Sequence, residues 1–214
     1  MRSSLLLVAY ALVVSGCAQT GAFHPPVVLP PGRAALDLVG AHGDVQHTTR
    51  GGGGNSAFTL AEGRLAVGFV KGAEAALHAS TTGAGGSVRV MPFGPKVPVA
   101  IFAGGGRTRA QPGSYFGGSV VGTSRFAGVS AGLPLPPSAA LVPYVGLRYV
   151  GMDVASEACG DGDYDDCSTA RYPPHQYAIS LGVVATRSGP TLELSLYNGP
   201  PVAIAGGVLL RLRL

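Results

Sequence analysis

The chain has 214 residues, a net charge of +4 and only 12% charged residues, whereas hydrophobic residues make up 46% of it. Its basic residues are dispersed and form no basic helix or aromatic-basic stripe, so the sequence predicts no nucleic-acid partner. After the first apolar run, no stretch is long enough to form a membrane-spanning helix. An apolar chain without such stretches has to spread its apolar residues by alternation, which is typical of β-strands and especially of membrane barrels.

The beginning of the chain has the layout of an export signal. Arg2 supplies a positive charge, and Leu5–Val14 is an apolar run too short to span a bilayer as a helix. Cys17 then stands where the small-residue cleavage site of such a signal is expected. The sequence therefore predicts an exported protein.

The four residues that follow the apolar run, Val14-Ser15-Gly16-Cys17, resemble the bacterial lipobox. In that family a branched apolar residue and two small residues precede a cysteine that becomes the lipid-modified N-terminus. The resemblance implies that residues 1–16 are a lipoprotein signal peptide and that Cys17 carries diacylglyceryl and palmitate groups. An ordinary signal peptide that contains a cysteine is the alternative. Ala18, in place of Asp, implies that lipoprotein-sorting machinery forwards the chain to the outer membrane.

The residues after Cys17 fall into two segments. Residues 18–32 are rich in proline and have no periodicity, so 17–32 is predicted to be a lipidated cysteine with an extended tether. From Arg33 onward the apolar residues recur with a period of two, which predicts one β domain over 33–214. The pattern is clearest at the C-terminus, where three leucines alternate with Leu209, Arg211 and Arg213.

This alternation predicts an all-β fold, a single antiparallel up-and-down β-barrel of about ten strands, with eight as the alternative. The predicted strands cover roughly 33–42, 64–69, 73–81, 86–91, 98–105, 117–133, 145–150, 176–186, 192–197 and 202–214.

The breaks between the predicted strands alternate in length. Short turn-like breaks, such as Lys71-Gly72, alternate with mostly longer ones at 43–57, 106–116 and 153–174. Short turns at one rim and long loops at the other are typical of membrane barrels. With an even strand count, the N- and C-termini are both expected at the short-turn rim, facing the periplasm.

This architecture resembles small outer-membrane β-barrel proteins. The last strand is similar to that family's C-terminal assembly signal, although it ends in Leu214 where the family has an aromatic residue. The resemblance implies barrel-assembly machinery and membrane lipid as partners, and the sequence indicates no particular protein partner.

The apolar face of each strand is predicted to meet lipid and the mixed face to fill the lumen. Because charges packed inside a barrel must pair or meet water, we expect a plugged lumen with no open channel. A soluble, periplasmic lipocalin-like carrier of apolar ligands, with the two faces exchanged, is an alternative. The predicted lumen residues are Asp37, Glu62, Arg64, Glu74, His78, Arg89, Arg148, Glu193, Arg211 and Arg213.

Two cysteines remain once Cys17 is set aside. Cys159 and Cys167 bracket an acidic stretch, 160–166, and an exported chain permits a disulfide between them. Two free thiols are the alternative. The acidic stretch does not have the spacing of a calcium loop, and no Cys/His spacing suggests zinc. We therefore expect no metal ion and no cofactor.

One pair of residues suggests chemistry. His78 and Ser80 share a face of one strand with Glu74, and a lipid A deacylase family of outer-membrane barrels uses a His-x-Ser pair with a Glu. The residues after Ser80 do not match that family. We therefore expect no catalytic residues and a structural or interaction role, with a deacylase-like hydrolase as the alternative.

Overall fold

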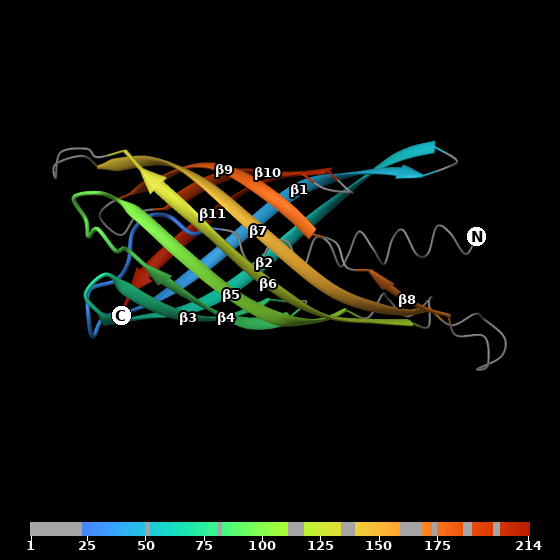
Figure 1. Cartoon of the computed structure of the whole chain (residues 1–214), viewed down its shortest axis with the longest axis horizontal. Helices are drawn as coiled ribbons and strands as arrows, with labels where there is room; N and C mark the ends of the chain where they lie inside the picture. Colours follow the sequence, from blue (N-terminus) through green and yellow to red (C-terminus); the bar gives the residue numbers. More distant parts are fainter. Residues whose placement is uncertain are drawn as a thin grey trace.

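The computed structural model of the chain describes residues 23–49, 52–80, 83–110, 118–133, 140–158, 168–172, 175–185, 190–198 and 202–214. Within them it has antiparallel strands only (Figure 1). No helix among these residues is long and apolar enough to cross a membrane. The strands are β1 (Ala34–Thr49), β2 (Gly52–Val70), β3 (Ala73–Ser80), β4 (Gly83–Val90), β5 (Val99–Ala110), β6 (Gly118–Gly132), β7 (Leu141–Ala158), β8 (Ser168–Tyr172), β9 (His175–Ala185), β10 (Thr191–Asn198) and β11 (Val202–Arg213).

Ten of these strands close into an up-and-down barrel. Each pairs with its neighbours in the chain, except that β9 takes the place next to β7, and β1 pairs with β11 to complete the ring. The short strand β8 lies outside this ring and pairs only with the end of β7, at Val154–Ala158. The predicted all-β barrel of about ten strands is therefore confirmed, and the count of eight is wrong.

The predicted long breaks are mostly strand. β1 and β2 run on through 43–57 and pair up to Thr49 and Gly52. β7 likewise continues to Ala158 and pairs there with β8. Sequence alternation did not reveal these extensions because they have no apolar face, whereas backbone pairing needs only neighbouring N–H and C=O groups.

The two rims of the barrel therefore differ in strand length. At one rim, here called the terminal rim, β1 begins and the chain ends, and the Leu214 N–H donates to the Ala34 carbonyl at 3.0 Å. Its tightest turn is Lys71-Gly72, where Gly72 has a φ of 78° that favours glycine. At the opposite rim, here called the extended rim, the hairpin of β1 and β2 and the strands β6 and β7 project outward (Figure 1).

The described part of the predicted tether lies inside the barrel. Phe23 and Leu29 are each buried, and they pack against strand residues that face the lumen. The segment then leaves the lumen at Pro31-Gly32 and enters β1. Residues 23–32 are here called the plug. Its first part, 23–29, is buried or half-buried in the barrel, and 30–32 are exposed at the rim, so the plug does not form a free linker. A ten-stranded barrel is wider than the eight-stranded barrel that side chains alone can fill, which explains why a chain segment fits inside.

The two faces of the strands divide by polarity. Many outward side chains are apolar and exposed, whereas the inward ones include four carboxylates and four arginines that are buried or nearly buried. Four charged residues that are described face outward and are exposed, namely Asp44, Arg107, Arg125 and Asp153. Leu181 is 58% exposed, and Asp37 and Arg64 are 0% and 2% exposed. This is the arrangement of a membrane barrel and the reverse of a soluble lipocalin-like barrel. The exposed apolar set includes Leu38, Leu65, Val67, Leu77, Ile101, Val129, Leu147, Ile179, Leu192, Leu194, Leu196, Ile204, Leu210 and Leu212.

Candidate functional site in the barrel lumen

A network of buried ion pairs lies in the lumen near the terminal rim. Arg211 of β11 donates two hydrogen bonds of 2.7 Å to the carboxylate of Asp37 on β1. It also lies 3.3 Å from Glu74 of β3, which forms a second ion pair with Arg89 of β4. These side chains come from four strands, so the network joins the wall of the barrel across its interior.

A second charged group lies deeper. Arg64 and Glu62 share the inward face of β2 and approach each other at 3.4 Å. His78 of β3 places Nδ1 3.7 Å from the other oxygen of Glu62. Taken with the remaining pair, Arg148 and Glu193, the described ion pairs join four arginines to four carboxylates. The buried arginines and carboxylates therefore balance in charge, and each lies near an opposite charge, as buried charges require.

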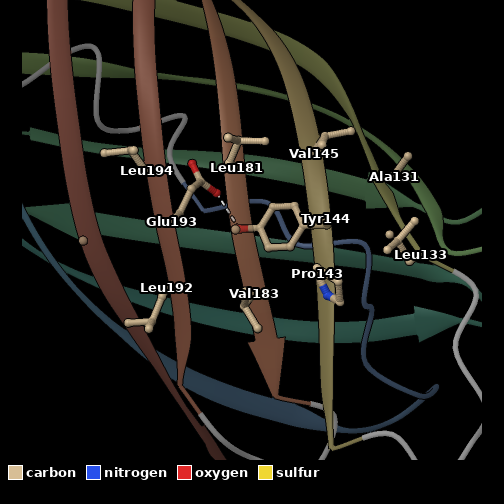
Figure 2. Close-up of a pocket in the computed structure, with 13 residues that line it drawn as sticks. Ala131, Leu133, Pro143, Tyr144, Val145, Leu181, Val183, Leu192, Glu193 and Leu194 are labelled. Carbon is tan, nitrogen blue, oxygen red and sulfur yellow. Dashed lines mark hydrogen bonds between the residues drawn. The ribbon is translucent and has the colours of Figure 1, made fainter.

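The third group links β7, β9 and β10. The Tyr144 hydroxyl donates to Glu193 at 2.6 Å, and Figure 2 shows this hydrogen bond crossing β9. Ser195 also donates to Glu193, at 2.9 Å, and Arg148 donates to Tyr197 at 2.8 Å. These bonds fix the two tyrosine side chains inside the lumen, where both are buried.

Glycines make room for these large side chains. Tyr144 pairs across the sheet with Gly182, and a methyl group there would overlap the tyrosine ring.

On the outer face of the same strands lies a groove of about 640 Å³. Leu181, Leu192 and Leu194 stand along it and point away from Tyr144 (Figure 2). The same three strands therefore present polar contacts inward and hydrocarbon outward.

The plug is bound by charged side chains from the neighbouring strands β2, β3 and β4. Arg64 donates to the Phe23 carbonyl at 3.1 Å, and Arg89 donates to the Pro25 carbonyl at 2.8 Å. In return, the Leu29 N–H donates to Glu74 at 2.9 Å. Prolines have no N–H group, so few donors within the plug can bond its carbonyls, and arginines of the wall donate to them instead. These hydrogen bonds replace those that the carbonyls and the arginines would make with water.

Apolar contacts complete the packing of the plug. His24 stacks on Phe102 with ring centroids 4.1 Å apart and an interplanar angle of 11°. Phe23 packs with Val39 and Leu209, and a methyl group at Gly207 would overlap the Phe23 ring. The described lumen is accordingly filled at this level by side chains and plug, and it forms no open channel there.

The predicted lumen residues can now be placed. Nine of the ten are buried or nearly buried inside the barrel, as predicted. Arg213 is the exception, because it lies on the lumen face of β11 but at the terminal rim, where it is exposed.

The pair with possible hydrolytic chemistry also faces the lumen. His78 is buried against Glu62, and the Ser80 hydroxyl donates to the Gly83 carbonyl at 3.3 Å. A lipid substrate in the membrane would meet the outward face of β3, so this placement does not favour a lipid hydrolase. Glu74, which shares the face of His78 and Ser80, pairs with Arg89 near the terminal rim.

Several predicted sites fall elsewhere. Cys17, Cys159 and Cys167 lie outside the described residues. Among the residues that are described, no cluster of His, Cys, Asp and Glu could hold a metal ion.

The plug is the feature that sequence reasoning missed. Its one signal is a set of large apolar residues, Phe23 and 27–29, within a proline-rich stretch, since a solvated tether does not need them.

Comparisons with known proteins give a likeness of fold only. No protein-family model and no curated protein matches the chain. Among solved structures, the attachment invasion locus protein Ail of Yersinia pestis has 10% identity and a TM-score of 0.45, covering 86% of this chain and 99% of that one. The translocator domain of the autotransporter NalP from Neisseria meningitidis has 12% identity and a TM-score of 0.45, covering 100% and 98%. Neisserial surface protein A has 10% identity and a TM-score of 0.37, covering 83% and 96%. At these values the likenesses carry no argument about activity or partners.

Proposed function

We propose that the chain is a lipid-anchored outer-membrane β-barrel protein with a structural or interaction role and no catalytic activity. The observation that carries the proposal is the closed barrel with exposed leucines outside and paired charges inside. A surface of this kind is stable only where hydrocarbon surrounds it, and closed barrels from strands of this type occur in outer membranes. The lipobox-like frame at Cys17 supports a second attachment, through lipid.

The role of the barrel follows from its filled lumen. The plug and the ion pairs occupy the interior, so the barrel supports no steady flow of solute through the described section. What remains for recognition is the extended rim, where the ends of β1, β2, β6 and β7 project outward (Figure 1). We therefore propose that the barrel holds these strand ends at the membrane surface, with the disulfide Cys159–Cys167 closing the connection after β7.

The test is membrane fractionation combined with gel mobility before and after heating. An integral barrel remains with the membrane after alkaline extraction and migrates faster in detergent gels when unheated. Mass spectrometry of the same sample should find an acylated Cys17 as the first residue. Release by alkali together with one gel mobility would reject the membrane barrel, whereas an unmodified N-terminus would reject only the anchor.

The disulfide is tested separately. Thiol labelling of denatured, unreduced protein should find neither Cys159 nor Cys167 free, and labelling after reduction should find both. Two labelled cysteines before reduction would reject the pairing without affecting the barrel.

A further inference from the structure

The outward face of β6, β7 and β9 changes from apolar to polar as these strands approach the extended rim. On β7 the outward side chains run from Leu147 through Tyr149 to Asp153, and on β6 Arg125 follows the apolar outward residues. Tyrosines mark the change, since the rings of Tyr149 and of Tyr177 on β9 lie 5.5 Å apart between centroids. Aromatic residues in such a position are typical of the level at which a barrel leaves the hydrocarbon.

Three polar side chains meet at this level around Gly151 of β7. Gly151 pairs with Arg125 on one side and with His175 of β9 on the other. A Cβ atom added at Gly151 would lie 3.1 Å from the Tyr149 hydroxyl and 3.5 Å from Cγ of Arg125. The tyrosine hydroxyl and the arginine side chain are therefore neighbours above the glycine. The same hydroxyl lies 2.6 Å from Nδ1 of His175.

This group offers a positive charge and hydrogen-bond donors. Arg125 is exposed, and no ion pair within the described part of the chain involves it. Its guanidinium can donate to two oxygens of one group. Whichever of Tyr149 and His175 donates in their shared hydrogen bond, a hydroxyl or ring N–H of the pair remains for a ligand. Such a set of donors suits an oxyanion.

The charges nearby leave the site positive. Arg107 of β5 pairs with Thr123, two residues along β6 from Arg125, and is exposed on the same outward face. Asp153 pairs with the same threonine from β7. The two arginines therefore outnumber the carboxylate of these three exposed residues, and Asp153 lies farther toward the extended rim than Arg125.

The surface below the site is apolar. Next to Arg125 on the outward face of β6 is Ala127, which pairs with Tyr149, and beyond it Val129 pairs with Leu147. An anion bound at Arg125 would thus lie directly above a hydrocarbon-facing surface. A phospholipid has this combination of a phosphate and acyl chains, and it presents the phosphate at the edge of the hydrocarbon.

We propose that Arg125, Tyr149 and His175 bind the phosphate group of a membrane lipid in the leaflet next to the extended rim, with its acyl chains along Ala127 and the pair below it. The proposal rests on the proposed membrane location of the barrel and adds a specific lipid contact to it.

The test measures lipid binding by native mass spectrometry of the full chain, folded and purified in a non-ionic detergent. The probe is dioctanoyl phosphatidic acid, and dioctanoylglycerol and inorganic phosphate each carry one half of its chemistry. The unchanged protein is compared with Arg125→Gln. The control is Lys71→Gln, which removes one exposed positive charge at the terminal rim. Insertion of each protein into phosphatidylcholine vesicles is measured in parallel.

Phosphatidic acid is expected to bind the unchanged protein at least about tenfold more tightly than either other probe, and Arg125→Gln is expected to lose about tenfold of that affinity, because a hydrogen bond to a charged group is removed. Lys71→Gln should bind like the unchanged protein. Equal affinity for dioctanoylglycerol or for inorganic phosphate would overturn the inference, as would equal losses in the two variants. Insertion into vesicles without selective binding rejects the lipid site alone, whereas failure to insert rejects the membrane barrel and the lipid site with it.

Discussion

The two faces of β10 show how one strand meets two environments. Leu192, Leu194 and Leu196 are about half exposed on one face, whereas Glu193, Ser195 and Tyr197 on the other are almost wholly buried and hydrogen-bonded. In a soluble protein the first set would be the core. Here the polar set is the core, so its energy depends on complete pairing, while the leucine set depends on surrounding lipid. The faces should therefore respond to opposite kinds of substitution.

The largest effect is expected on the lumen face, from Glu74→Ala. This change removes the shared partner of Arg89 and Arg211 and the acceptor of the Leu29 N–H. Breaking a buried pair by removing one partner costs about 3–5 kcal/mol. Urea titration of the barrel folded in lipid vesicles would measure it. The control is Asp44→Ala, an exposed carboxylate of β1, which is expected to change stability by less than about 0.5 kcal/mol. Equal effects of the two variants would mean that the network is not buried.

The second effect concerns the outer face. Leu194→Arg places a charge in the middle of the apolar face of β10, where it is expected to cost about 2–4 kcal/mol in a bilayer. Asn198→Arg, on the same face of the same strand but at its polar end, is expected to cost about 0–1 kcal/mol. The folded fraction after reconstitution gives the comparison. A smaller loss of folded fraction for Leu194→Arg than for Asn198→Arg would mean that the bilayer surrounds another part of the barrel.

The third and smallest effect isolates the plug. A methyl group at Gly68 would overlap the carbonyl of Pro30, so Gly68→Ala must shift the plug and is expected to cost about 1–3 kcal/mol. Gly63→Ala, five residues away on the outward face of β2, has nothing within 4 Å of the new group. It is expected to be neutral or slightly stabilising. Both are measured by urea titration, and a neutral Gly68→Ala would show that the plug does not pack against β2.

The sequence predicted the barrel better than it predicted the lumen. An alternation of apolar and polar residues predicts a strand. The sequence therefore predicted all ten barrel strands and assigned their charged residues to the inward face. Alternation does not mark strands such as the end of β1, where the sequence has no run of alternating apolar residues. It also cannot show that Glu62 lies beside His78 or that Arg89 binds Pro25, because these contacts depend on the register of different strands. The plug has no period at all, and only the width of a ten-stranded barrel explains its place.

The opposite character of the two faces can be measured directly on neighbouring residues of β10. Leu194→Cys and Ser195→Cys, each in a Cys159→Ser/Cys167→Ser background and folded in lipid vesicles, are treated with a lipid-soluble thiol reagent and with a charged one. The structure predicts that Leu194→Cys reacts with the lipid-soluble reagent only, because its side chain is 54% exposed on the apolar face. Ser195→Cys should react with neither, since its position is buried among Ser180 and Glu193. Labelling of Ser195→Cys by the charged reagent would contradict a filled lumen, and labelling of Leu194→Cys by that reagent would contradict a lipid-facing exterior.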